Sequence, residues 1–395
     1  MRFPEFSGEW EEHTLSEYLE FKNGLNPDAK RIGSGLPFIS VMDILSEGVI
    51  NYDNIRGKVN ATEKEIECFG VKDGDLLFQR SSETLEDVGR ANVYMDNRTA
   101  IYGGFVIRGR KIGNYDPLFF KYLLATPLAR KRTCRMGAGA QHFNIGQEGL
   151  SKISLYFPSI EEQRKIAGFL SLIDERIATQ NKIIEKLQSL IKGLNDNIHK
   201  GIKGETVCFS DLGEAYSGLS GKGGDDFGYG EPFITYMNVY QNTYISEKDY
   251  ELVQIAPNEK QNSVQYGDAL FTLSSETPEE VGIGAVYLGN TQKLYLNSFC
   301  FGIHFYDERV LPQYLAHFIS SSSFRRAIYP LAQGSTRFNL QKNDFMKMKF
   351  LLPSLEKQGH IANTLDALHC RLANEKSLTE QYILLKKYLL SLMFI

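Results

Sequence analysis

Residue types that could carry catalysis occur throughout this chain of 395 residues, but their spacing matches no common catalytic site. The five cysteines form no Cys-x-x-Cys pair, and the seven histidines show no metal-ligand spacing. Residues 218–224 lack the Gly-x-x-x-x-Gly-Lys-Ser/Thr spacing of a phosphate-binding loop. The Gly-x-Gly matches at 137–139 and 282–284 are isolated, and no feature marks a Ser-His-Asp triad. The absence of these motifs favours a binding function over an enzymatic one.

The positive charge of the chain is gathered in a few short clusters. The net charge is −4 at pH 7 and the pI is about 6.1, so bulk charge does not attract nucleic acid. A nucleic acid would have to be bound by local clusters of basic residues. The alternative interpretation is that these clusters are ordinary solvated surface. The clusters comprise Arg108, Arg110 and Lys111; Arg130, Lys131, Arg132 and Arg135; and Arg325, Arg326 and Arg337.

Composition and the two ends of the chain indicate a cytoplasmic protein without a membrane partner. Residues 1–6 contain no apolar run and therefore no signal peptide. The longest apolar stretch, 382–395, is interrupted by Lys386 and Lys387 and is too short to span a bilayer. The scattered cysteines also suggest a reducing compartment.

The sequence of one half of the chain returns in the other half. Residues 71–84 return at 264–277, 193 positions later, and both segments contain Gly-Asp-x-Leu-Phe and Ser-Ser-Glu-Thr. Two further pairs follow in the same order, 195 positions apart: 37–43 with 232–238, and 141–144 with 336–339. A period of about half the chain is far too long for a solenoid repeat and indicates two copies of a whole domain.

Each copy is predicted to contain a globular part followed by a long helix. The globular parts, 1–157 and 201–352, contain short runs of aromatic and β-branched residues broken by turn signals, which is typical of a mixed α and β domain. A turn that enters a strand is predicted at 71–78. Further strands are predicted at 100–107 and 298–305, and helices with proline in the first turn at 117–124 and 312–319.

The long helices are predicted at 158–200 and 353–395, the first opening with a capping box of Ser159 and Glu162. Apolar residues recur in both at alternating steps of four and three, as in a coiled coil. Because neither helix can bury this stripe alone, we expect the helices to pack antiparallel, and packing of each on its own domain is the alternative. The expected fold is α+β: two similar mixed α/β domains joined by two long antiparallel coiled-coil helices, with an internal pseudo-twofold duplication.

The two helix openings carry a resemblance to a known family. They read Pro-Ser-Ile-Glu-Glu-Gln-Arg-Lys-Ile-Ala at 158–167 and Pro-Ser-Leu-Glu-Lys-Gln-Gly-His-Ile-Ala at 353–362, and the chain opens Arg-Phe-Pro-Glu-Phe-Ser-Gly-Glu-Trp at 2–10. These segments resemble the specificity subunit of type I restriction-modification enzymes. The resemblance covers essentially the whole chain, and the pattern Pro-x-x-x-x-Gln-x-x-Ile-Ala occurs twice.

The resemblance implies a non-catalytic subunit that recognises double-stranded DNA. The globular parts would be target recognition domains, each reading one half of a bipartite sequence, and the helices would set the length of the unread spacer. Two modification subunits would carry adenine methylation and bind S-adenosylmethionine. Restriction subunits would carry ATP- and Mg-dependent translocation and cleavage, so this chain would bind no cofactor itself.

The sequence agrees with such a division of labour. No two prolines are adjacent, which excludes the Asn/Asp-Pro-Pro-aromatic motif of adenine methyltransferases, and Pro27-Asp28 has no convincing Asp/Glu-x-Lys partner of a nuclease. A scaffold that joins two partner proteins without DNA specificity is the other interpretation, and the acidic pI slightly favours it.

Residues for DNA contact are expected in three loops of each copy and in the basic clusters. Arg, Asn and Gln can read base edges, whereas Ser and Thr are adaptable and Lys suits phosphates. In the first copy the candidates are Ser40, Asp43, Gln79, Arg80, Ser81, Ser82, Lys131, Arg132, Arg135, Gln141, His142 and Asn144. In the second copy they are Thr235, Asn238, Thr272, Ser274, Ser275, Arg325, Arg326, Gln333, Ser335, Thr336, Arg337 and Asn339.

Differences between the copies separate these candidates. Ser-Ser-Glu-Thr is identical in both copies, so it is expected to shape a loop or to contact phosphate, if the halves read different sequences. Phe-Asn is shared as well, and its Phe is expected in the core and its Asn in a turn or cap. Positions that differ are better candidates for base choice: Arg80 against Leu273, Gln141 against Thr336, and His142 against Arg337.

Overall fold

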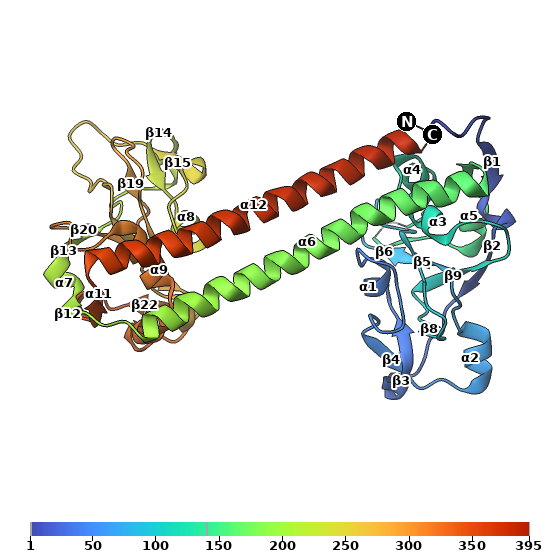
Figure 1. Ribbon diagram of the computed structural model, residues 1–395, viewed down its shortest axis with the longest axis horizontal. Helices are drawn as coiled ribbons and strands as arrows, with labels where there is room; N and C mark the ends of the chain where they lie inside the picture. The colour runs from blue at the N-terminus through green and yellow to red at the C-terminus, as the bar shows by residue number, and fades with distance from the viewer. Residues whose placement is uncertain (1, 140, 395) are drawn as a thin grey trace. The chain divides into compact units, whose positions relative to one another are not determined.

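The computed structural model describes residues 2–139 and 141–394, so the outer limits of the predicted segments at residues 1 and 395 lie outside the described residues. The chain divides into two compact units, one of residues 1–181 with 377–395 and one of residues 182–376. Helices α6 (Ile160–Lys200) and α12 (Leu355–Met393) are each continuous across the border between the units (Figure 1). Each unit therefore holds one globular part together with segments of both long helices.

The centre of the first unit is an antiparallel sheet of four strands in the order β2-β9-β5-β7. All four residues of its strand β5 are buried. Successive side chains of a strand point to opposite faces, so the sheet is covered on both faces at β5. Leu76 and Phe78 join the larger core with helix α3, whereas Leu77 joins a second core on the other face. The elements are β2 (Leu19–Asn23), β5 (Leu76–Gln79), β7 (Ala91–Val93), β9 (Val106–Lys111) and α3 (Pro117–Leu124).

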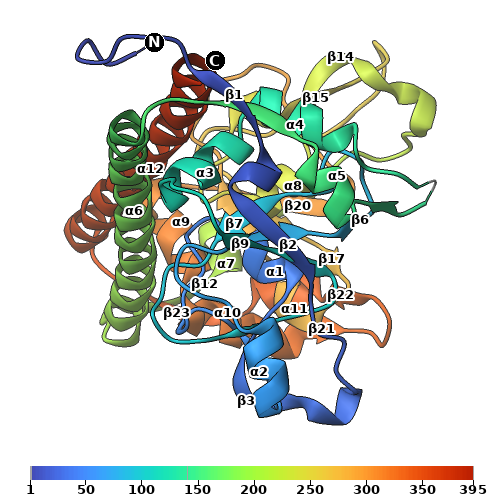
Figure 2. The ribbon, with the colours of Figure 1, turned by 90° about the vertical axis from the view of Figure 1, so that its right-hand side faces the viewer.

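A smaller sheet, β4-β3-β8, carries helix α2 beside it in both ribbon views (Figures 1 and 2). The predicted strand over 100–107 is wrong at its centre, because the chain leaves the small sheet at β8 and enters the large sheet at β9. Gly103 and Gly104 form the turn between them, where the Val106 amide donates to the Gly103 carbonyl at 2.9 Å. The elements are β3 (Ile32–Ile39), β4 (Gly57–Val59), β8 (Ile101–Tyr102) and α2 (Glu63–Phe69).

The second unit repeats this arrangement, which confirms the duplication. Its four-stranded sheet has the order β13-β20-β16-β18 and its small sheet the order β15-β14-β19. The large sheet comprises β13 (Gly213–Ser217), β16 (Ala269–Thr272), β18 (Gly284–Val286) and β20 (Cys300–Phe305). The small sheet comprises β14 (Phe227–Ile234), β15 (Tyr250–Val253) and β19 (Tyr295–Leu296), and helix α9 (Pro312–Ser320) corresponds to α3.

The long helices contribute to the core of each unit. In the first unit Ile166 and Leu170 of α6 share a core with Leu389 and Met393 of α12. Lys386 of α12 pairs with Asp174 of α6 at 2.5 Å, and Arg176 donates to the Tyr382 hydroxyl at 3.3 Å. Since later residues of α6 meet earlier residues of α12, the two segments run antiparallel in this unit.

In the second unit the later part of α6 and the first part of α12 share one core. It contains Leu194 and Ile198 of α6 and Ile361 and Leu365 of α12, together with strands β16 and β20. The predicted stripes therefore pack on the globular parts as well as on each other, so both alternatives drawn from the sequence are realised.

The glutamine of each helix opening ties the helix to its globular part. Gln358 is fully buried; its Oε1 accepts from the Leu311 amide at 2.7 Å, and its Nε2 donates to the Arg309 and Pro353 carbonyls at 2.9 Å. Gln163 makes two of the equivalent bonds at the start of α6. Its side-chain oxygen accepts from the Asp116 amide at 3.1 Å, and its side-chain nitrogen donates to the Pro158 carbonyl at 3.0 Å. One side chain thus satisfies backbone groups on both sides of the junction.

The predicted capping box at the start of α6 is half right. The Ser159 hydroxyl accepts from the Glu162 amide at 3.3 Å, as an N-cap does. The Glu162 carboxylate instead accepts from the Arg2 guanidinium at 2.6 and 2.7 Å, which fixes the start of the chain against the helix.

Candidate nucleic-acid interface

The second and third predicted loops meet in both globular parts. Strand β6 (Ser81–Ser82) pairs with β10 (Phe143–Asn144), with Ser82 opposite Phe143. Strand β17 (Ser274–Ser275) pairs with β22 (Phe338–Leu340) in the same register, with Ser275 opposite Phe338. The two segments that are identical in the copies therefore build one small ladder in each unit.

The hydroxyls of this ladder hold the loop. The Ser82 hydroxyl accepts from the Thr84 amide at 3.2 Å, and the Ser275 hydroxyl accepts from the Thr277 amide at 3.4 Å. In the first copy Ser81 donates to Asn144 across the ladder. These bonds support the interpretation that Ser-Ser-Glu-Thr shapes a loop.

Two further candidates at this ladder are buried. Gln79 is 5% exposed and its Nε2 donates to the Ser81 carbonyl at 2.9 Å. Thr272 is fully buried and its hydroxyl accepts from the Ile283 amide at 3.1 Å. Both side chains face their own domain and position the ladder.

The first predicted loop forms the start of a helix in each copy. Asp43 is buried, and its carboxylate accepts from the Ser40 amide at 2.7 Å and hydroxyl at 2.8 Å at the start of α1 (Val41–Ile44). The Thr235 hydroxyl accepts from the Asn238 amide at 3.1 Å at the start of α8 (Tyr236–Gln241). Thr235 therefore caps α8 and the Ser40–Asp43 pair closes the start of α1. Buried Asn238 bonds both backbone groups of Ser246 and so ties α8 to the loop that follows it.

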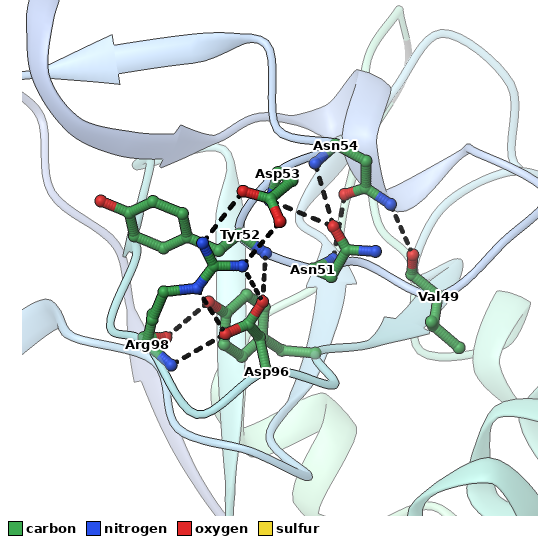
Figure 3. A network of polar contacts seen from close by, with 8 residues as sticks. Val49, Asn51, Tyr52, Asp53, Asn54, Asp96 and Arg98 are labelled. Carbon is green, nitrogen blue, oxygen red and sulfur yellow. Dashed lines mark hydrogen bonds and ion pairs between the residues drawn. The ribbon is translucent and has the colours of Figure 1, made fainter.

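The loop that follows α1 is held by a second polar network (Figure 3). The Arg98 guanidinium bonds Asp53 and Asp96 at distances of 2.7–3.0 Å and lies 4.4 Å from the centre of the Tyr52 ring. The bond from Arg98 lowers the pKa of the Asp96 carboxyl well below its ordinary value. Arg98 is therefore occupied within the first unit.

The basic clusters divide into internal and exposed residues. Arg130 donates to the Glu86 and Val88 carbonyls at 2.8 and 2.6 Å. Arg325 repeats this in the second copy, donating to the Gly282, Glu279 and Val281 carbonyls. Burial lowers the pKa of both guanidinium groups, and both hold the loop that follows Ser-Ser-Glu-Thr.

Arg108, Arg110 and Arg132 are also occupied inside the first unit. Arg108 and Arg110 donate to the Gly70 carbonyl at 2.9 and 2.6 Å, and Arg132 bonds Glu12 and Ser154. DNA contact by Arg132 or Arg325 stays a prediction, but their bonds serve the fold. Lys131, Arg135 and Arg326 are exposed.

The third predicted loop presents its side chains to solvent in both copies. The tips of the hairpins carry exposed Gln141, His142 and Asn144 in the first unit and exposed Gln333, Ser335, Thr336, Arg337 and Asn339 in the second. Gly139 and Gly334 have φ angles of +147° and +148°, and a Cβ there would lie within about 2 Å of the carbonyl of His142 or Arg337. Gly139 and Gly334 thus share one backbone conformation, while the residues that follow them carry different side chains in the two copies.

A hollow of about 300 Å³ lies beside the hairpin of the second unit. Its lining joins the predicted residues Ser274, Ser275 and Arg337 to residues that were not predicted: Tyr236, Met237, Tyr240, Glu276, Glu280 and Phe299. The Arg337 guanidinium lies 5.4 Å from the centre of the Phe299 ring. The Tyr240 hydroxyl donates to Glu280 at 2.7 Å, and this bond lowers the pKa of the Glu280 carboxyl.

The most exposed of the missed residues recur in the first copy. Met42 and Met237 are 72% and 47% exposed, and Phe105 and Phe299 are 68% and 51% exposed. The backbone confirms the equivalence of the phenylalanines. The Phe105 carbonyl accepts from the backbone amide of Arg80 at 2.9 Å, and the Phe299 carbonyl accepts from the backbone amide of Leu273 at 2.8 Å. The signal in the sequence was an apolar residue at nearly the same offset in both copies, in a turn for the phenylalanines and at the start of a helix for the methionines.

The described residues hold no group of three or more His, Cys, Asp or Glu side chains that could bind a metal ion. Within residues 2–139 and 141–394, no helix is long and apolar enough to cross a membrane. The loops described above carry hydrogen-bonding and aromatic side chains instead.

Comparisons with known proteins agree on one family. A family model described as the type I restriction modification DNA specificity domain matches residues 7–189 and 204–381. The putative type I restriction enzyme MjaX specificity subunit of Methanocaldococcus jannaschii is 24% identical over 416 residues, covering 98% of this chain and 93% of that protein. The EcoKI specificity subunit of Escherichia coli K12 is 24% identical over 194 residues, covering 48% of this chain and 41% of that protein.

Solved structures show the same fold. The S subunit of a type I restriction-modification system from M. genitalium aligns with a TM-score of 0.54 at 12% identity, covering 98% of this chain and 96% of that chain. A chain from a structure on complex assembly and conformational transition of the type I system aligns with a TM-score of 0.61 at 14% identity, covering 97% of each chain.

Proposed function

The chain belongs to the family of type I restriction-modification DNA specificity domains, and we propose that it reads a bipartite DNA target, one half-site with each globular part. It acts as the non-catalytic specificity subunit of a complex whose modification subunits methylate adenine. The fold places the same recognition frame twice in one chain, which suits a target made of two short half-sites.

The observation that carries the proposal is the pair of exposed hairpins. Their ladders and glycines are the same in both units, whereas their tips differ: Gln141 and His142 against Thr336 and Arg337. A common frame with different polar tips is the arrangement expected of two readers with different half-sites, because base choice depends on the donor and acceptor pattern of the tip.

Side chains that are already bonded inside the domain serve as the frame, and exposed ones make the contacts. The exposed tip residues are proposed to read bases, together with Arg80, which is part-exposed and bonded only weakly to the Gly104 carbonyl at 3.4 Å. Exposed Lys131, Arg135 and Arg326 suit phosphates. Ser40, Asp43, Thr235 and Asn238, which are bonded at the starts of α1 and α8 or to Ser246, belong to the frame that holds these loops.

The proposed partners are those that the resemblance to the family implies. Two modification subunits bring S-adenosylmethionine and flip out the target adenine, and restriction subunits bring ATP and Mg for translocation and cleavage. This chain contributes sequence choice and the docking of the partners to the target, and the long helices set the accepted spacer length.

An exchange of hairpin tips tests the proposal. The double variant Thr336→Gln and Arg337→His gives the second hairpin the side chains of the first. In cells that express the modification subunits, we expect the methylated motif to change in one half-site and to keep the other half-site and the spacer. The matched control, Lys347→Ala, alters an exposed residue outside the predicted loops and is expected to leave the motif intact. A motif unchanged by the exchange would refute the role of the hairpins.

A further inference from the structure

In each globular part an arginine reaches the turn that carries an exposed phenylalanine, but the two arginines come from different elements. In the first unit Arg80 follows β5, and its guanidinium lies 3.4 Å from the Gly104 carbonyl, next to Phe105. In the second unit Leu273 stands at the place of Arg80, and Arg337 of the hairpin covers Phe299 instead. The arginine is thus exchanged between elements while its aromatic neighbour is kept.

The two phenylalanines have no part in the cores of the described residues. Phe105 is 68% exposed and Phe299 is 51% exposed. Phe299 lines the hollow together with exposed Met237, and Met42, the counterpart of Met237 in the first copy, is exposed as well. Exposed phenylalanines can make apolar contact with thymine methyl groups in the major groove. Together with the arginine they form an amphipathic contact surface.

The charges around Arg337 favour base edges over phosphates. Its hollow also contains the carboxylates of Glu276 and Glu280, and Glu83 stands at the place of Glu276 in the first copy. Carboxylates repel phosphate groups, whereas a base pair offers both donors and acceptors in the major groove. The planar guanidinium matches O6 and N7 of guanine with two parallel hydrogen bonds.

We propose that Arg80 and Arg337 each read a guanine, one in each half-site, with Phe105 and Phe299 packing beside the bases they contact. This inference rests on the proposed function and assigns a base to it. Because the arginines start from different elements, the two guanines lie at different positions within their half-sites. Each half-site therefore contains at least one G·C pair that its domain requires.

The test is a pair of single variants, Arg80→Ala and Arg337→Ala, in the complete complex with its modification subunits. Methylation is measured on DNA libraries that vary one half-site at a time. We expect Arg337→Ala to lose a preference for G·C of about five- to 150-fold at one position of one half-site. Arg80→Ala is expected to do the same in the other half-site, with the remaining positions unchanged.

Arg326→Ala provides the control for a phosphate contact, because Arg326 is exposed in the same unit and outside the hollow. It is expected to weaken methylation about equally on all sequences. A uniform loss with Arg337→Ala, without a change in preference at any position, would overturn the guanine assignment. Wild-type complex without any bipartite preference would instead overturn the proposed function, so the two failures are distinguishable.

Discussion

Replacement of Gln358 by leucine is expected to destabilise the second unit by about 3 kcal/mol, since three hydrogen bonds of about 1 kcal/mol each are lost. Leucine has a similar volume, so no cavity contributes, and the groups left without their partner are the Leu311 amide and the Arg309 and Pro353 carbonyls. For a unit of this size each kcal/mol moves the unfolding temperature by about 2–4 °C, which gives a decrease of about 10 °C.

Thermal unfolding followed by circular dichroism measures this decrease. Gln358→Glu keeps the acceptor and loses the two donated bonds, so it is expected to be destabilised as well. Lys357→Ala alters the preceding, exposed residue of the same helix, and this variant is expected to have the unfolding temperature of the wild-type protein. If Gln358→Leu unfolds within about 2 °C of Lys357→Ala, the reasoning about the helix opening is refuted.

Four further predictions follow from other parts of the molecule. Gly334→Ala forces a Cβ to within about 2 Å of the Arg337 carbonyl and so distorts the hairpin. Methylation should then lose its dependence on one half-site. The control Gly359→Ala adds a Cβ that meets no atom within 4 Å, and it should not alter the methylated motif. Phe394→Ala removes a ring that packs 6.1 Å from Trp10 and 5.4 Å from Phe119, and calorimetry should show the first unit destabilised by about 3 kcal/mol; an unshifted transition would contradict this packing. Burial lowers the pKa of His317 below its ordinary 6.5 in the folded protein. Below about pH 6.5 the unfolded chain therefore binds more protons at this residue than the folded chain does. The free energy of unfolding that His317 contributes above about pH 6.5 is thus lost as the pH falls towards the folded-state pKa. The decrease in unfolding temperature between about pH 7.5 and about pH 5.5 should therefore be smaller in His317→Gln, and an equal decrease would count against this assignment. Seven residues inserted into each long helix, after residue 181 and after residue 376, lengthen each helix by about 10 Å, which is the length of about three base pairs. The methylated motif should then keep both half-sites and gain a longer spacer. An unchanged spacer would show that the helices do not determine its length.

The fold was predictable where local signals were strong. Helix α3 begins and ends as predicted because Asp116 caps it and Pro117 occupies its first turn. The strand over 100–107 was mispredicted because the pattern is continuous across Gly103 and Gly104, and only the neighbouring sheets decide that the chain turns there. Propensity alone does not contain that tertiary choice.

The site was predictable as a set of loops but not residue by residue. Comparison of the copies suggested that Ser-Ser-Glu-Thr shapes a loop or contacts phosphate, since identical residues in both copies point to a shared role. The bonds of Ser82 and Ser275 within the loop support the first interpretation. Arg130 and Arg325 sit among exposed basic neighbours in the sequence, and only the distant carbonyls of 86–88 and 279–282 show that they are internal. Phe105 and Phe299 were missed because an aromatic residue suggests a core position, and their exposure depends on the turn that carries them.

The central claim is that one chain reads two half-sites, and a genome-wide map of adenine methylation in the host, with and without the gene for this chain, tests it most directly. The account predicts the loss of a single bipartite motif, two short half-sites around an unread gap, and its return when the gene is restored. An unchanged methylation map in a host whose modification subunits are active would contradict it.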